Sequence, residues 1–186
     1  RYSDLVDAVV AAKKGLGLGR PVHLFGAGHP MIFALAAAMG CDLFDSAAYA
    51  LYARQDRYLT VQGTGKLEEM SYLPCSCPVC QKHTLKELMN SPEKARLLAR
   101  HNLYVSMQEI RQVKESIREG SLWDLLEVRC RSHPRMLDGL RRLALKGEWL
   151  EKLDTARKST FFCTSAEGSL RPEVLRYAQR IDRISL

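Results

Sequence analysis

Three cysteines lie close together in the segment Cys75-Ser76-Cys77-Pro78-Val79-Cys80. Thiolates at this spacing cannot all face a hydrophobic core, and Pro78 favours a tight loop between them. His101 follows at the distance of a loop plus a helix. Three thiolates and one imidazole form the closed four-ligand set that structural Zn²⁺ prefers. The sequence therefore predicts a structural zinc site formed by Cys75, Cys77, Cys80 and His101.

Two alternatives to this ligand set remain open. His83, which follows Cys80 closely, is the rival fourth ligand. We favour His101 because it would share a helix face with Leu97 and Val105, so that it points inward and ties the loop to the fold. The other alternative is a metal-free core histidine beside reduced core cysteines.

The remaining cysteines, Cys41, Cys130 and Cys163, lie among apolar neighbours, and we expect them to be reduced residues of the core. We expect no secretory signal and no disulfide framework. No run of apolar residues is long enough to cross a bilayer. These features predict a cytoplasmic protein with no membrane partner.

Asp45 is the best candidate for a catalytic residue. It lies at the C-terminal end of a predicted strand over residues 41–45, and parallel α/β barrels carry their chemistry at that end. The alternative is that Asp45 only caps the turn that follows. Gly26-Ala27-Gly28 follows another predicted strand, over residues 22–25. Its glycines would let a flat ligand approach the backbone, although a tight turn is the simpler explanation.

The net charge of +7 and the isoelectric point near 9.2 suit a polyanionic partner such as nucleic acid. A basic surface without a partner is the common alternative. Arg54, Arg57 and Lys66 lie among tyrosines shortly after Asp45. Basic and aromatic side chains near a candidate active site suit single-stranded or unstacked RNA.

Hydrophobic periodicity and breaker residues predict the elements that position these side chains. In chain order they are a helix over 3–14 capped by Ser3, a short buried strand over 22–25, a helix from Pro30 to Gly40, a strand over 41–45, an irregular loop with a short hairpin over 47–73, a helix opened by Ser91 and Pro92 and ending near Arg118, helices over 121–131 and 134–146, a short helix near Trp149, a strand over 160–163 and a helix after Pro172.

The opening order of helix, strand, helix and strand indicates an α/β fold with parallel strands. Two parallel strands do not form a stable sheet alone, because such sheets need neighbouring strands and cover on both faces. We therefore expect these strands to close a larger α/β barrel or open sheet. The rest of that sheet would lie upstream or in a partner chain.

Taken together, these residues resemble the tRNA-guanine transglycosylase family in its archaeal, archaeosine-forming branch, over roughly residues 1–130. The matching segments are Leu24-Phe25-Gly26-Ala27-Gly28-His29-Pro30, Gly40-Cys41-Asp42-Leu43-Phe44-Asp45-Ser46-Ala47, Tyr52-Ala53-Arg54, Arg57-Tyr58-Leu59-Thr60, Cys75-Ser76-Cys77-Pro78-Val79-Cys80 and His101-Asn102-Leu103.

The resemblance implies the last strands and helices of a (β/α)₈ TIM barrel with an inserted zinc-binding subdomain, followed by a mainly helical segment. On this basis residues 1–60 would be the C-terminal portion of the barrel. Residues 61–131 would be the zinc-binding subdomain with its long helix, and 132–186 a helical linker or the start of an accessory domain.

The resemblance also implies base exchange, in which guanine at position 15 in the D-arm of tRNA is replaced by the free base preQ0. Asp45 would be the nucleophile that forms a covalent intermediate with the ribose. Phe25, Gly26 and Gly28 would line the base pocket, and the basic residues near Asp45 would contact tRNA. The family's second catalytic aspartate belongs to the missing half of the barrel, so we expect the chain to need that N-terminal half. Relatives suggest a homodimer.

Three alternatives to this function remain. The first is a non-catalytic, tRNA-binding paralogue or subunit of the same family. The second is a bacterial-type queuosine enzyme, although the run after Asp45 looks archaeal. The third is a zinc-stabilised RNA-binding module, which would explain the charge and the cysteines but not the α/β segment that leads to Asp45.

Overall fold

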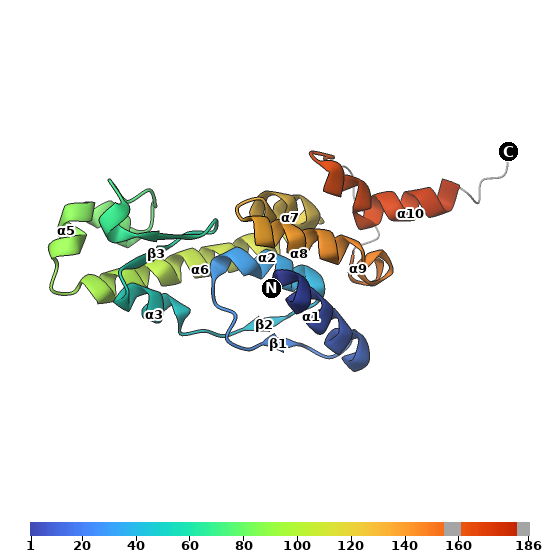
Figure 1. Cartoon of the computed structure of the whole chain (residues 1–186), viewed down its shortest axis with the longest axis horizontal. Helices are drawn as coiled ribbons and strands as arrows, with labels where there is room; N and C mark the ends of the chain where they lie inside the picture. Colours follow the sequence, from blue (N-terminus) through green and yellow to red (C-terminus); the bar gives the residue numbers. More distant parts are fainter. Residues whose placement is uncertain (155–160, 182–186) are drawn as a thin grey trace. The chain divides into compact units, whose positions relative to one another are not determined.

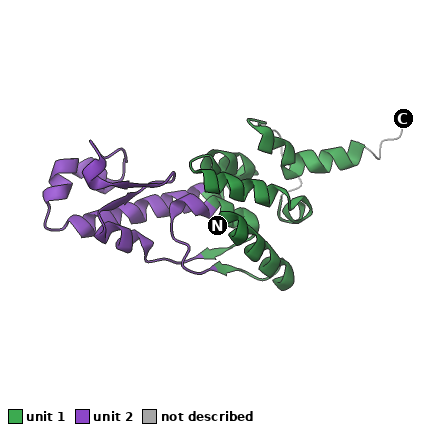
Figure 2. Cartoon of the chain, viewed as in Figure 1, with its two compact units in different colours: residues 1–23, 34–43, 113–186 green, residues 24–33, 44–112 purple. Residues whose placement is uncertain are grey.

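The computed structural model describes residues 1–154 and 161–181, which fall into two compact units (Figures 1 and 2). Unit 1 combines Arg1–His23, Ala34–Leu43 and Val113–Leu186, and unit 2 combines Leu24–Phe33 and Phe44–Gln112. Unit 2 therefore joins a short segment from near the start of the chain to a longer one, which contains the cysteine cluster.

Short helices make up most of the described chain. The helices are α1 (Tyr2–Leu16), α2 (Phe33–Met39), α3 (Ala48–Arg54), α4 (Pro78–Lys82), α5 (Leu85–Asn90), α6 (Lys94–Glu119), α7 (Leu122–Cys130), α8 (Pro134–Ala144), α9 (Gly147–Leu153) and α10 (Pro172–Ile181), with 3-10 turns η1 (Pro30–Ile32), η2 (Leu67–Glu69) and η3 (Ala166–Leu170). The strands are β1 (His23–Leu24), β2 (Leu43–Phe44), β3 (Arg57–Leu59) and β4 (Thr64–Lys66).

In unit 1, α1 packs against α8, and α8 also contacts α7 and α9. The contact is close because α8 carries Gly139, where an added Cβ would lie 3.1 Å from both Leu35 and Tyr2. The buried face of α1 repeats at helical spacing through Val6, Val9 and Val10. The helix predicted for residues 3–14 is thus confirmed, but Ser3 lies inside it and does not cap it.

The predicted strand–helix–strand segment forms, with shorter strands than expected. β1 and β2 make a two-stranded sheet, and Val22 O accepts from Asp42 N at 2.8 Å. Pro30 opens the turn that leads into α2, and Gly40 ends α2 with a φ of +103°. The expectation that the strand over 22–25 is buried is wrong. His23 of β1 is exposed and the adjoining Phe25 is 83% exposed, because the β1–β2 sheet has only two strands to cover them.

Besides the segment Leu24–Phe33, unit 2 contains a hairpin, three short α-helices and the first part of α6. In the β3–β4 hairpin, Arg57 pairs with Lys66 and Leu59 with Thr64. The hairpin lies along α6, to which side-chain hydrogen bonds join it (Figure 1). The core of unit 2 contains the buried side chains of Ala53, Tyr58, Leu67, Val79, Leu88 and Leu98.

Three sequence predictions for unit 2 need correction. The segment 47–73 contains the predicted hairpin but also α3, so it is not an irregular loop. Pro78 does not form a tight loop between the cysteines, because it occupies the first turn of α4, where its missing N–H costs nothing. The long helix begins at Lys94, after a turn in which Ser91 Oγ accepts from Glu93 N.

The C-terminal part of unit 1 confirms the helices predicted for 121–131, 134–146, the region of Trp149 and the segment after Pro172. The predicted strand over 160–163 is not found over Phe161–Cys163, and Thr160 lies outside the described residues. Cys41 and Cys130 are buried as expected, whereas Cys163 is exposed, since its segment forms no strand that could bury it.

Among the residues that the structure describes, no helix combines the length and the apolar character needed to cross a membrane.

Candidate metal centre and catalytic aspartate

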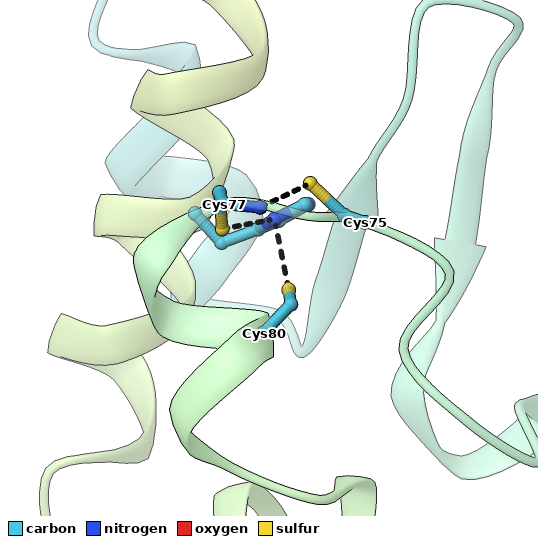
Figure 3. Close-up of side chains that lie close together, drawn as sticks. Cys75, Cys77 and Cys80 are labelled. Atoms are coloured by element: carbon cyan, nitrogen blue, oxygen red, sulfur yellow. Dashed lines mark hydrogen bonds between the residues drawn. The ribbon is translucent and has the colours of Figure 1, made fainter.

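The four predicted ligands come together in unit 2. The sulfur atoms of Cys75, Cys77 and Cys80 and a ring nitrogen of His101 all lie within 4.8 Å of one another. Cys75 comes from the loop before α4, Cys77 is the N-cap of α4, and Cys80 lies one turn into it (Figure 3). His101 comes from α6, so the cluster joins a loop, a short helix and a long helix.

Hydrogen bonding fixes which nitrogen of His101 faces the sulfurs. Its Nε2 lies 3.1 Å from the backbone oxygen of Leu59, which can only accept, so Nε2 carries the proton. Nδ1 then directs a lone pair toward the Sγ atoms of Cys77 and Cys80, at 3.5 and 3.4 Å. Burial lowers the pKa of His101 to about 4, which keeps the imidazole neutral, as a metal ligand must be.

These distances fit a tetrahedral ion. An ion about 2.3 Å from sulfur and about 2.0 Å from nitrogen places the two ligand atoms about 3.5 Å apart. The two measured Nδ1–Sγ distances match this value. The backbone N–H of Cys77 also points at Cys75 Sγ, at 3.3 Å, as N–H donors do toward metal-bound thiolates. The group can therefore hold a metal ion.

The surroundings of Cys80 disfavour its thiolate form when no cation is bound. Burial raises the pKa of the Cys80 thiol to about 12, although a hydrogen bond from Tyr58 partly opposes the rise. Tyr58 also stacks on the His101 ring, with the ring centroids 3.7 Å apart. A cation that binds deprotonated thiolates would offset this desolvation. His83, the rival ligand, is the C-cap of α4 and is not part of the cluster.

Asp45 directly follows β2 and is exposed, so a substrate can reach it. The backbone N–H of Gly26 donates to Asp45 Oδ1 at 2.9 Å, which ties the carboxylate to the loop after β1. At the start of α3, the backbone N–H of Ala48 donates to the hydroxyl oxygen of Ser46, the neighbour of Asp45. The capping contact that the alternative assigned to Asp45 is thus made by Ser46. The structure thus places Asp45 beside Gly26, as a shared site would require.

Steric constraints explain why both positions of the loop, 26 and 28, are glycines. Gly26 has a φ of +73°, a conformation that other residues rarely adopt. At Gly28, an added Cβ would lie 1.8 Å from the Cβ of Ser46, so a side chain there would displace the segment that carries Asp45. Phe25, the other predicted pocket residue, is exposed beside them. The glycines therefore serve both a tight turn and a close approach to the Asp45 segment.

The three predicted RNA-contacting residues are exposed but differ in their surroundings. Arg57 lies opposite Lys66 in the hairpin, with its guanidinium 5.6 Å from the centroid of the Tyr52 ring. Lys66 donates to Glu69 at 2.9 Å, and this hydrogen bond raises the pKa of its ammonium group. Arg54 lies in the last turn of α3. The two arginines are better placed than Lys66 to attract a polyanion, because a carboxylate neutralises Lys66.

Asn102 is a residue whose role the sequence did not reveal. It is fully buried next to His101, and its Oδ1 accepts from Leu59 N at 2.9 Å. Its Nδ2 donates to the backbone oxygens of Tyr49 and Arg57, each at 3.1 Å. One side chain thus joins α6, β3 and α3. In the sequence, the only sign of this role is that Asn102 lies inside the matched segment His101-Asn102-Leu103.

Comparison with known proteins identifies relatives of this chain. The family model described as queuine tRNA-ribosyltransferase matches residues 1–135. The chain is similar to the tRNA-guanine(15) transglycosylases of Haloarcula marismortui, at 60% identity, and Methanosarcina barkeri, at 58%. These matches cover 99% and 100% of this chain and 38% of each relative. The corresponding protein of Methanocaldococcus jannaschii is 53% identical, over 99% of this chain and 29% of its own length.

The chain therefore spans well under half the length of the curated relatives that it matches. The resemblance inferred from the cysteine cluster and the segment that ends at Asp45 is confirmed by the family match, which includes both features. The chain belongs to the queuine tRNA-ribosyltransferase family.

Proposed function

We propose that this chain is the C-terminal part of the catalytic region of a tRNA-guanine(15) transglycosylase, which exchanges guanine in the D-arm of tRNA for preQ0. The observation that carries the proposal is the pairing of Asp45 with the glycine loop, in a chain that also has a complete four-ligand metal cluster. The names of relatives at 53–60% identity support the same reaction.

In this reaction a carboxylate oxygen of Asp45 attacks C1′ of the target ribose. The bond from C1′ to guanine breaks, and guanine leaves with its electron pair and takes up a proton. The carboxylate is then bonded to C1′, as in retaining glycosidases. The incoming base attacks the same carbon, loses a proton and releases Asp45, so that two inversions give net retention. The hydrogen bond from Gly26 N orients the carboxylate for attack.

The target nucleotide must leave its stack to reach Asp45. Gly26 and Gly28 allow a flat base to approach the backbone, and the exposed ring of Phe25 offers a surface on which it can stack. Arg54 and Arg57 would bind neighbouring phosphates, since guanidinium groups form paired hydrogen bonds with phosphate oxygens.

The metal in this proposal is a structural Zn²⁺ bound by Cys75, Cys77, Cys80 and His101. Four protein ligands leave no open position for water or substrate, so the ion contributes to folding and not to the chemical step. It would link the loop before α4 to α6 and, through His101 Nε2 and Leu59, to the β3–β4 hairpin.

The N-terminal part of the barrel is a necessary partner in this proposal, because the two-stranded β1–β2 sheet alone does not form a barrel. We also propose a homodimer and a cytoplasmic location, in keeping with an enzyme that acts on tRNA. Domain boundaries near residues 60 and 131 remain part of the same proposal.

The decisive experiment uses a chimera in which this chain replaces the matched segment of the Methanosarcina barkeri relative. Denaturing mass spectrometry of the chimera mixed with tRNA should show a covalent adduct. Asp45→Asn should abolish the adduct and retain tRNA binding, whereas Asp138→Asn, at an exposed position on α8, should leave it unchanged. An adduct that persists in Asp45→Asn would refute the assignment of the nucleophile. Binding of tRNA without an adduct in the parental chimera would support the non-catalytic paralogue.

A further inference from the structure

His29 connects the loop that holds Asp45 to the hairpin of the metal centre. Its Nε2 lies 2.9 Å from the hydroxyl oxygen of Thr64, at the start of β4. Its Nδ1 accepts from Met31 N at 3.2 Å. Because Nδ1 is the acceptor in a neutral ring, Nε2 carries the proton and donates to Thr64 Oγ1. The ring is half-buried and also meets Tyr52 edge-on, with the ring centroids 5.9 Å apart.

On the hairpin side, Thr64 lies in register with Leu59. The backbone of Leu59 is held at both of its polar atoms by α6, through His101 Nε2 on its oxygen and Asn102 Oδ1 on its nitrogen. Leu59, which His101 anchors, is therefore the direct cross-strand neighbour of Thr64, which His29 contacts.

On the catalytic side, His29 follows Gly28 directly. Gly28 lies against Ser46 so closely that no Cβ fits between them, and Gly26 N donates to Asp45 Oδ1. Phe25 and Gly26, in the first half of this loop, are exposed. In its second half, the hydrogen bonds of His29 with Thr64 and Met31 limit its movement.

We propose that His29 is a positioning residue, which with Thr64 fixes the glycine loop, and thus the carboxylate of Asp45, to the metal-anchored hairpin. This role rests on the proposed base exchange. A small displacement of a reacting group lowers the rate steeply, because the attacking oxygen must be aligned with C1′. The metal centre then affects catalysis through the position of Asp45, without taking part in the reaction.

The test compares two substitutions of Thr64 in the chimera. Thr64→Val keeps the shape and loses the hydroxyl, whereas Thr64→Ser loses a methyl group and keeps the hydroxyl. We expect Thr64→Val to slow adduct formation roughly 10- to 100-fold, and Thr64→Ser to stay close to the parental rate. Zinc content and the Kd for tRNA should be the same in all three proteins. His29→Phe removes the same hydrogen bond and also the one from Met31 N, so it should slow the reaction at least as much as Thr64→Val. The double variant should be no slower than His29→Phe alone, since Thr64→Val then has no further bond to remove.

A second readout does not depend on the reaction. Hydrogen exchange at the Gly26 amide, which is bonded to Asp45, should be faster in Thr64→Val than in Thr64→Ser or the parent. Equal adduct rates for Thr64→Val and the parent, or a serine variant as slow as the valine variant, would overturn the proposal. If the parental chimera forms no adduct, the proposed function fails, and the exchange rate at Gly26 alone supports or overturns the positioning role.

Discussion

Asn102 offers a direct test of how unit 2 is held together. Its side chain forms three hydrogen bonds, to Leu59 N, Tyr49 O and Arg57 O, at 2.9, 3.1 and 3.1 Å. Asn102→Ala removes all three hydrogen bonds at once. Because the side chain is fully buried, the space that it leaves is too enclosed for easy hydration of the three backbone groups.

The magnitude follows from the burial of each partner. Leu59 is fully buried, so its unpaired N–H should cost about 1–3 kcal/mol, and each of the two carbonyls, which lie on less buried residues, about 0.5–1.5 kcal/mol. The sum predicts a loss of about 2–6 kcal/mol in the free energy of unfolding of unit 2. Asn90→Ala is the matched control, since Asn90 is exposed at the end of α5, and it should cost less than about 0.5 kcal/mol.

The assay is chemical unfolding of the zinc-loaded protein, followed by metal release to a chromogenic chelator. Metal release reports on unit 2, which contains all four candidate ligands, whereas fluorescence of Trp123 and Trp149 reports on unit 1. The midpoint of metal release should shift strongly in Asn102→Ala and hardly at all in Asn90→Ala. A shift in Asn102→Ala no larger than in the control would refute the view that this amide anchors β3 and α3 to α6.

Cys80→Ser should lower zinc affinity at least roughly tenfold, because a hydroxyl is a much poorer ligand than a thiolate, whereas Cys163→Ser, at an exposed cysteine outside the cluster, should leave metal content unchanged; equal zinc content in the two variants would contradict the ligand assignment. Gly28→Ala should slow adduct formation in the chimera at least roughly tenfold, since its Cβ would collide with Ser46 beside the nucleophile, and parental kinetics would show that the loop can shift without harm. Hydrogen bonding from an arginine of α8 lowers the pKa of Glu167 from 4.5 to about 2, so its stabilising effect is present above pH 4.5 and is lost as the pH falls toward 2. The stability difference between the parent and Glu167→Gln, measured by chemical unfolding, should therefore be constant above about pH 5.5 and shrink below pH 4.5, and a difference that is unchanged at pH 3 would argue against this ion pair.

Local sequence signals predicted most of the helices and the metal cluster. The helical spacing of Leu97, His101 and Val105 placed the imidazole on the inner face of α6, and the structure has it there. Gly40 marked the end of α2, and Pro134 and Pro172 marked the starts of α8 and α10, because their backbone restrictions act within a few residues.

The errors arise where a local pattern does not determine the structure. The sequence offered Ser3 as a helix cap, but α1 begins one residue before it. Cys163 lies among apolar residues in the sequence but is exposed, since neighbours along the chain do not show which side of a segment is covered. The role of Asp45 remains a prediction, which its hydrogen bond from Gly26 supports.

By itself, the sequence determined the chemistry available to this protein: the three cysteines and one histidine that suit a metal, and the aspartate that ends a strand. Residue type and short-range periodicity are properties of the chain, so they can be read without a structure. Only the tertiary structure established that Asn102 joins three elements and that His29 reaches Thr64. Those contacts link residues 35 to 53 positions apart, and no local pattern encodes which distant backbone atoms will meet.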